Sequence, residues 1–190
     1  AGNGVILITT KSGRQRPGLG ITVTSGVSIE NPFLRPKMQT SFGQGANGIY
    51  DSKSRLSWGP EIDGREVTNW DGKQVSLRAY DNYDAFFRTG VSFNEGVTFQ
   101  QDINGTSVFA SINRSDENGT TPKAKLEKTS FNVRATTFLD KDKRWQIDAK
   151  ANYINMNAKN RPIMGINPAN AYNTVYLLPT SFNLEDLKRG

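Results

Sequence analysis

Two absences limit the residues that could carry catalysis. The 190-residue chain contains no Cys and no His, so it lacks a thiol nucleophile, the commonest general base and the commonest metal ligand. A hydrolase would have to use carboxylates, Lys, Tyr or Ser, and no pair of carboxylates has a spacing typical of acid–base catalysis. We therefore predict that the chain is not an enzyme and has no catalytic residue, metal ion or cofactor.

Binding is the chemistry that the remaining side chains favour, and one candidate set lies in a long polar segment, 31–92. It contains aromatic residues that could stack on sugar rings or pack against a partner protein, or that could simply pack the segment on itself. The ligand candidates among them are Trp58, Trp70 and Tyr80, and Phe42 and Tyr50 belong to the same group.

A second candidate set consists of polar residues at every second position of apolar segments. They could contact a ligand, or they could form a hydrated wall of paired charges. Asp148 and Lys150 have opposite charges two residues apart, which favours mutual pairing over ligand binding. The set comprises Arg134, Asp148, Lys150 and Asn152, together with Thr22, Thr24 and Asn132.

The elements that must position these side chains are strands. Apolar and polar residues alternate with period two in five segments, 19–29, 93–101, 106–113, 129–139 and 145–155. Such alternation is typical of strands that have one apolar face and one polar face. We expect an all-β fold with about five antiparallel strands.

The connections between these strands alternate in length. They are long at 30–92, short at 102–105, long at 114–128, short at 140–143, and long again from 156 onward. Antiparallel neighbours run in opposite directions, so all long connections fall at one end of the sheet. This asymmetry is typical of outer-membrane barrels, which have short periplasmic turns and long extracellular loops. The pattern therefore predicts a fragment of an antiparallel transmembrane β-barrel.

A soluble β-sandwich is the main alternative, because its strands also alternate. Ala135, Ala149 and Ala151 would fill a sandwich core poorly, whereas Trp145 and Tyr153 lie near strand ends, as in the aromatic girdles of membrane barrels. One residue does not fit the apolar face, since Glu95 interrupts it. Its place near the long-loop end would make it tolerable, and a β-bulge would also accommodate it.

The charge of the chain limits its partners. The formal net charge is +6, but the Lys and Arg residues are scattered and do not form a basic stripe. A solvated basic surface explains this composition, and we expect no nucleic-acid partner.

Several stretches resemble one family of proteins. The sequence AGNGVILITTKSG, residues 1–13, closely resembles the end of the plug domain in SusC/RagA-type TonB-dependent transporters. The segment 81–90 is similar to the short helix and Thr-Gly that precede the second barrel strand of that family. Further similarity covers Asn118-Gly119 with Pro122, the stretch 128–135, and Asn160-Arg161-Pro162.

The resemblance implies a domain organisation. Residues 1–13 would be the C-terminal end of the plug, 14–18 the plug–barrel junction, and 19–190 the first part of the barrel. Its long extracellular loops would be 31–92, 114–128 and 156–190. The whole barrel would have about 22 strands, so the chain would be a fragment that begins inside a longer protein.

The resemblance also implies a function. Such transporters lie in the bacterial outer membrane, in contact with its lipid, and actively import glycans or oligopeptides. TonB would act through a segment upstream of Ala1, and a SusD-like surface lipoprotein would cap the extracellular face. The segment from Pro32 to Tyr80 matches nothing in the family, so the substrate is not predicted. A passive outer-membrane barrel or adhesin and a soluble carbohydrate-binding β-sandwich remain as alternatives.

Overall fold

The computed structural model describes residues 19–189, which divide into two compact units. The sheet unit comprises the described residues 19–29, 91–118 and 125–159, and the loop unit comprises 30–90, 119–124 and 160–189. The predicted plug end, 1–13, and the predicted junction, 14–18, lie outside the described residues. No helix in the described part of the chain is long and apolar enough to cross a membrane.

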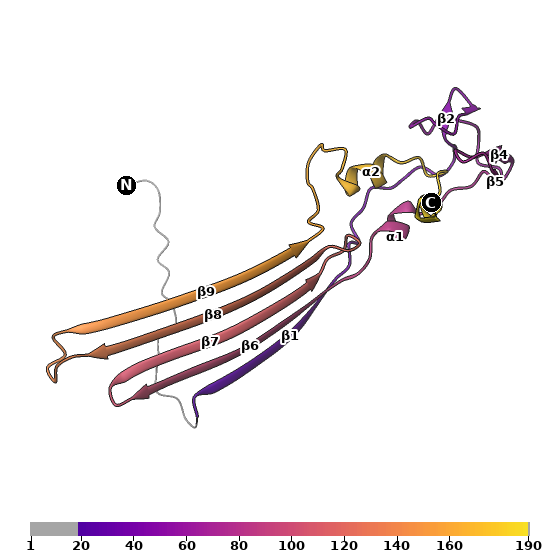
Figure 1. The fold of residues 1–190 in the computed structure, drawn as a ribbon. Coiled ribbons are helices and arrows are strands. Elements are labelled where there is room, and N and C mark those ends of the chain that lie inside the picture. Colours follow the sequence, from indigo (N-terminus) through magenta and orange to yellow (C-terminus); the bar gives the residue numbers. More distant parts are fainter. Residues whose placement is uncertain (1–18, 190) are drawn as a thin grey trace. The chain divides into compact units, whose positions relative to one another are not determined.

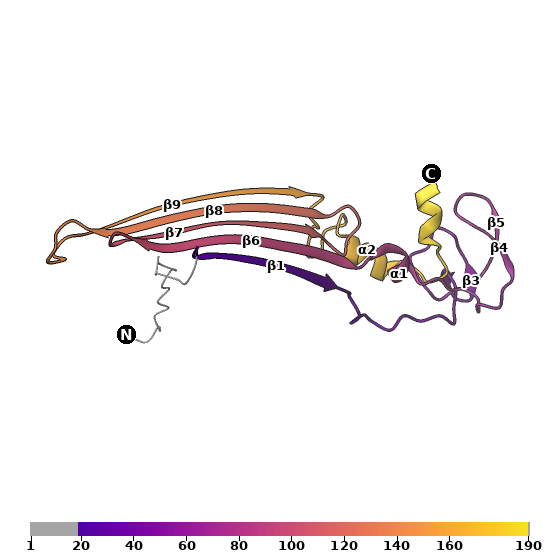
Figure 2. The ribbon, with the colours of Figure 1, turned by 90° about the horizontal axis from the view of Figure 1, so that it is seen from below.

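The sheet unit is a single antiparallel sheet of five strands in the order β1-β6-β7-β8-β9 (Figure 1). The predicted all-β fold is confirmed, and the sheet is open, with β1 and β9 as its two edges. Figure 2 shows the five strands side by side in one layer. The strands are β1 (Ile21–Glu30), β6 (Gly90–Ile103), β7 (Thr106–Asn118), β8 (Lys125–Phe138) and β9 (Gln146–Lys159).

The register of β6 to β9 separates two faces. Paired residues on neighbouring strands share a face, and Val97, Ile112, Phe131 and Tyr153 form one such row. We call the side that carries this row the apolar face. The opposite side, the polar face, carries the adjacent row Thr98, Ser111, Asn132 and Asn152. The alternation expected from the sequence is therefore continuous across four strands.

The strands extend further at the long-connection end than the sequence predicts. The connection expected at 114–128 is only 119–124, because β7 continues to Asn118 and β8 begins at Lys125. The period-two signal fails there because polar residues enter the apolar face, beginning with the row Glu95, Arg114, Thr129 and Asn155. The ladder between β6 and β7 pairs residue by residue past Glu95, so the suggested bulge is wrong.

The short connections are tight turns stabilised by Asp side chains. Asn104 and Gly105 both have positive φ, at 52° and 80°, which is the backbone of a type I′ hairpin turn. The Gly105 amide donates to Asp102 Oδ1 at 3.0 Å. In the β8–β9 turn, the Arg144 side chain and amide donate to Asp140 at 2.7 Å each. The hydrogen bond from the Arg144 side chain, together with hydrogen bonds from backbone amides, holds the pKa of the Asp140 carboxyl below its ordinary value.

The loop unit is built from short elements around a small core. Two hairpins pair β2 (Gly45–Ala46) with β3 (Ile49–Tyr50) and β4 (Glu66–Thr68) with β5 (Gln74–Ser76). The helices are α1 (Asn82–Phe86), α2 (Ala171–Leu177) and the 3₁₀ helix η1 (Leu184–Arg189). The short helix expected before the second long strand is thus present as α1.

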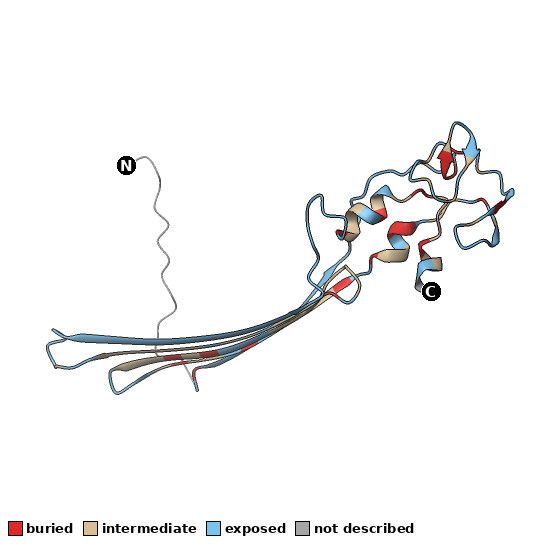
Figure 3. Cartoon of the chain, turned by 45° about the horizontal axis from the view of Figure 1, so that its top comes forward, coloured by how far each residue is buried: buried red, intermediate tan, exposed pale blue. Residues whose placement is uncertain are grey.

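The core of the loop unit is aromatic and lies between the helices. Tyr83 and Phe87 pack with Val175 and Leu184, and all four are buried. Figure 3 shows the buried positions on α1, α2 and the adjoining segments, whereas β1 and β9 are exposed along their length. This core joins residues about a hundred positions apart in the sequence, so it holds the ends of the loop unit together.

Candidate functional site

The first candidate site is a charged group on the polar face of β8 and β9. The Arg134 guanidinium donates to both oxygens of Asp148, with Nε–Oδ1 at 2.9 Å and Nη2–Oδ2 at 2.8 Å. Lys150 Nζ lies 3.7 Å from the same carboxylate. The expected pairing of Asp148 with Lys150 is therefore secondary, because the register places Arg134 on β8 opposite Lys150, from where its guanidinium makes two hydrogen bonds to Asp148.

A row of hydrogen bonds adjoins this ion pair. Asn152 Nδ2 donates to Asn132 Oδ1, and Asn132 Nδ2 donates to Ser111 Oγ at 3.2 Å. Arg134, Lys150 and Asn152 line a hollow of about 510 Å³ together with Phe109. The structure thus brings the predicted residues of β8 and β9 together and joins most of them by hydrogen bonds.

Two predicted residues lie elsewhere, and one residue was missed. Thr22 and Thr24 are on β1, which β6 and β7 separate from β8, and Thr24 Oγ1 donates to the Gly96 carbonyl oxygen at 3.3 Å. Phe109 lies on the polar face and is only 9% exposed. Its one signal in the sequence is an aromatic residue between Ser107 and Ser111, at a position where the alternation requires a polar residue.

Removing either partner of the Arg134–Asp148 pair should lower the free energy of unfolding slightly. The loss should be smaller when the other partner has already been removed. The two side chains are 19% and 28% exposed, so solvent screens the attraction and we expect a coupling free energy of about 0.5–1 kcal/mol. Urea unfolding of Arg134→Gln, Asp148→Asn and the double variant in detergent measures it. Strictly additive effects of the two substitutions would show that the ion pair contributes nothing.

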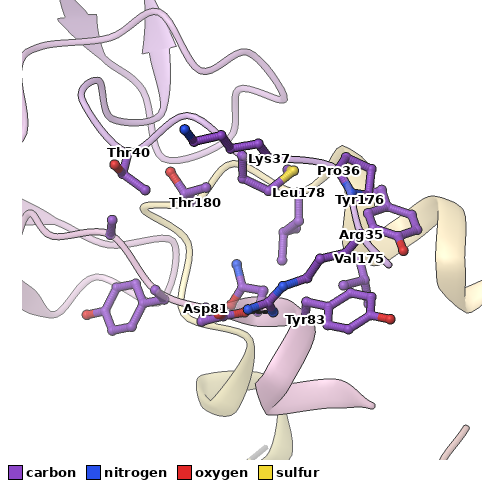
Figure 4. Close-up of a pocket in the computed structure, with 14 residues that line it drawn as sticks. Arg35, Pro36, Lys37, Thr40, Asp81, Tyr83, Val175, Tyr176, Leu178 and Thr180 are labelled. Carbon is purple, nitrogen blue, oxygen red and sulfur yellow. Dashed lines mark hydrogen bonds and ion pairs between the residues drawn. The ribbon is translucent and has the colours of Figure 1, made fainter. Parts of the chain in front are cut away.

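The second candidate site is a cavity of about 450 Å³ in the loop unit, and Tyr80 lines it. Its walls come from residues 35–40, 79–83 and 175–180 (Figure 4). The Arg35 side chain crosses it, with Nη1 at 3.1 Å from Asp81 Oδ1 and 2.9 Å from Asp84 Oδ1. The guanidinium carbon also lies 5.1 Å from the centroid of the Tyr83 ring. Arg35 therefore forms ion pairs with Asp81, which also lines the cavity, and with Asp84.

The aromatic wall of this cavity is already partly occupied. Tyr83 packs against Tyr176 with ring centroids 5.7 Å apart, and burial, followed by contact with Tyr176, raises the pKa of Tyr83. Arg78 lies over the Tyr80 ring at 4.9 Å and donates to its hydroxyl at 3.0 Å. The cavity therefore offers tyrosine rings and hydroxyl groups beside the Arg35–Asp81 pair, together with the amine of Lys37 and apolar side chains such as Val175 and Leu178.

The other two loop candidates do not join Tyr80. Trp58 is 63% exposed and lies against Phe42 with ring centroids 5.9 Å apart. Trp70, at the turn between β4 and β5, stacks on Phe182 with centroids 6.5 Å apart. Neither Trp lines the Tyr80 cavity, so the three residues do not form one site among the described residues.

Sequence reasoning missed Arg35, Tyr83 and Tyr176 in this cavity. Their contacts join segments that are about 50 to 100 residues apart, and no local pattern marks such pairs. The only signal available was the resemblance of segment 81–90 to the family's helix, which places Tyr83 on a helix but does not give its partners.

No protein-family model matches the chain. Over 165 residues, which are 85% of the chain, it is 26% identical to the TonB-dependent receptor SusC of Bacteroides thetaiotaomicron. The chain spans only 14% of the length of that receptor. The described residues therefore form an open, all-β sheet and a loop unit in a chain that is similar to one segment of a TonB-dependent receptor.

Proposed function

We propose that this chain is part of a TonB-dependent active importer in the bacterial outer membrane, with a glycan or an oligopeptide as substrate. The observation that carries the proposal is the apolar face, which is continuous across four neighbouring strands. The opposite, polar face carries the Arg134–Asp148 ion pair and the hydrogen-bonded row of Asn152, Asn132 and Ser111. Such a sheet suits a wall between lipid and an aqueous lumen. The similarity to SusC supports the same assignment.

The height of the apolar face is close to that of a membrane barrel. Two aromatic residues mark it along β9: Trp145, immediately before the strand, and Tyr153 within it, eight positions apart. At ~3.3 Å per residue and a strand tilt of ~40°, this span covers about 20 Å along the membrane normal. Outer-membrane barrels have an apolar band of ~25 Å flanked by aromatic girdles. We therefore place β9 across the bilayer between these two residues.

Charged pairs lie on the apolar-face side beyond this band. Arg114 Nε is 2.7 Å from Asp116 Oδ2, and Lys125 Nζ is 2.6 Å from Glu127 Oε1. These four side chains follow the aromatic row at the long-connection end of β7 and β8. Ion pairs there fit the headgroup and water layer and not the hydrocarbon, so we propose that these strand ends project outside the bilayer.

We propose the following roles for the parts of the chain. Residues 1–13 end the plug, 14–18 join it to the barrel, and 19–190 form barrel strands with extracellular connections. The polar face lines the lumen, where its residues contact plug or substrate. A SusD-like lipoprotein caps the loop unit, and TonB acts through a segment outside this chain. A passive barrel or adhesin is the second candidate, but the plug-like sequence of residues 4–10 counts against it.

Active import predicts energy-dependent uptake. A strain that lacks the gene should lose growth on one substrate from a panel of glycans and peptides, and the intact gene should restore it. Uptake of that substrate should stop when a protonophore or loss of TonB removes the energy supply. Uptake that persists without energy would indicate a passive barrel. Recovery of the protein in the aqueous phase without detergent would indicate the soluble sandwich.

A further inference from the structure

A second cavity of the loop unit differs in charge from the one that Tyr80 lines. It has a volume of about 510 Å³ and lies between the segment 52–55 and the segment 166–182. Lys53 and Arg55 line it, and no carboxylate is among its described lining residues. Within the described part of the chain, neither cation forms an ion pair. By contrast, the other cavity is lined by Asp81 as well as by Arg35 and Lys37, and Arg35 contacts two carboxylates.

Hydrogen bonds fix the segment that presents these cations. Gln44 is buried, and its Nε2 donates to the carbonyl oxygens of Ser52 and Ser54, at 3.1 and 2.6 Å. The backbone amide of Gln44 also donates to Ser181 Oγ at 2.7 Å, which joins this wall to the opposite one. Asp51 accepts from the backbone amide of Lys53 at 2.9 Å. The backbone that carries the two cations is thus held in place.

The opposite wall carries aliphatic side chains beside the polar residues Asn167, Asn173 and Thr174. Ile166 is fully exposed and Leu177 is 74% exposed, and Pro168 and Pro179 lie beside them in the lining. Among its described lining residues, Phe182 is the one aromatic residue, and it stacks against Trp70. Because rings that bind sugars need a free face, this wall suits an aliphatic group better than a sugar.

We propose that this cavity binds the end of a short peptide, in which a carboxylate adjoins an aliphatic side chain. The carboxylate would pair with Lys53 and Arg55, whose guanidinium can donate two parallel hydrogen bonds. The aliphatic side chain would cover Ile166 and Leu177. Asn167 uses its Oδ1 to accept from the Ala169 amide at 2.9 Å, and its Nδ2 is a further donor. The inference rests on the proposed function and assigns oligopeptides as its substrate class.

Equilibrium binding tests this assignment without any transport step. The probes are the tripeptide Ala-Leu-Leu with a free carboxylate, the same peptide as its C-terminal amide, and trigalacturonate as an acidic sugar. With purified full-length protein in detergent, calorimetry should show the free acid binding at least about tenfold more tightly than the amide. The double variant Lys53→Gln, Arg55→Gln should lose this preference.

Lys141→Gln is the control, because Lys141 is an exposed lysine in the β8–β9 turn and is not among the residues that line this cavity. It should leave the preference for the free acid unchanged. Equal binding of acid and amide, no binding of either, or an equal loss in Lys141→Gln would overturn the proposal. Tighter binding of trigalacturonate through Lys53 and Arg55 would overturn the peptide assignment. Peptide binding that persists while energised uptake fails would count against the importer alone.

Discussion

Arginine in place of Val133 should destabilise the membrane-inserted protein by about 2–4 kcal/mol, the cost of a basic side chain on the lipid face near the bilayer midplane. Val133 lies on the apolar face of β8, between Ala110 on β7 and Ala151 on β9. These neighbours are small, so they offer no acceptor for a guanidinium. The variant must therefore place its charge in hydrocarbon or distort the strand.

The matched control is arginine at the next position, Asn132, on the polar face. This change removes the hydrogen bonds with Ser111 and Asn152 and should cost about 1–2 kcal/mol. Both variants of the full-length protein can be folded into short-chain lipid vesicles and titrated with urea, with tryptophan fluorescence as the readout. Equal losses at the two positions, or a larger loss at Asn132, would show that the proposed orientation of the sheet is wrong.

The sequence predicted the middle of each strand better than its end. Within the apolar band, one face carries apolar residues and the other carries polar residues, so the sequence alternates with period two. On β9 the pattern changes after Tyr153, because Ile154 and Met156 are the next apolar residues and lie on the otherwise polar face. The apolar residues thus move to the other face of the sheet, while the backbone continues as a strand to Lys159. A rule that follows one apolar face ends the strand too early.

The candidate sites were predictable to different degrees for the same kind of reason. The alternation of polar and apolar residues is enough to place Arg134 and Asp148 on one polar face, and the structure places both of them there. Their two hydrogen bonds depend on the register of the two strands, and the alternation does not give that register. The Arg35 contacts with Asp81 and Asp84 cross 46 and 49 residues, and they depend on how the loop unit folds. No local spacing encodes that fold, so both loop cavities were missed.

Leucine in place of Asn82 should disrupt the loop unit, because this side chain joins two distant segments of it. Asn82 is 7% exposed. Its Nδ2 donates to the Phe182 carbonyl oxygen at 2.8 Å, and its Oδ1 accepts from the Leu184 amide at 3.0 Å. Leucine has a similar volume but would leave both backbone groups buried without partners, at about 1–3 kcal/mol each.

Hydrogen exchange can locate this effect. A local loss of about 2–6 kcal/mol for the two groups together corresponds to amide exchange roughly 30- to 25,000-fold faster, and we expect it in the peptides that contain Phe87 and Leu184. Asn173→Leu is the control, because Asn173 donates one exposed hydrogen bond, to the Gly165 carbonyl oxygen at 2.7 Å. It should change exchange by less than about fivefold. The sheet unit has its own ladder of backbone hydrogen bonds, so peptides from 106–118 should keep their protection in both variants. Unchanged exchange around Leu184 in Asn82→Leu would mean that the aromatic core of Tyr83, Phe87, Val175 and Leu184 holds the loop unit together without the amide of Asn82.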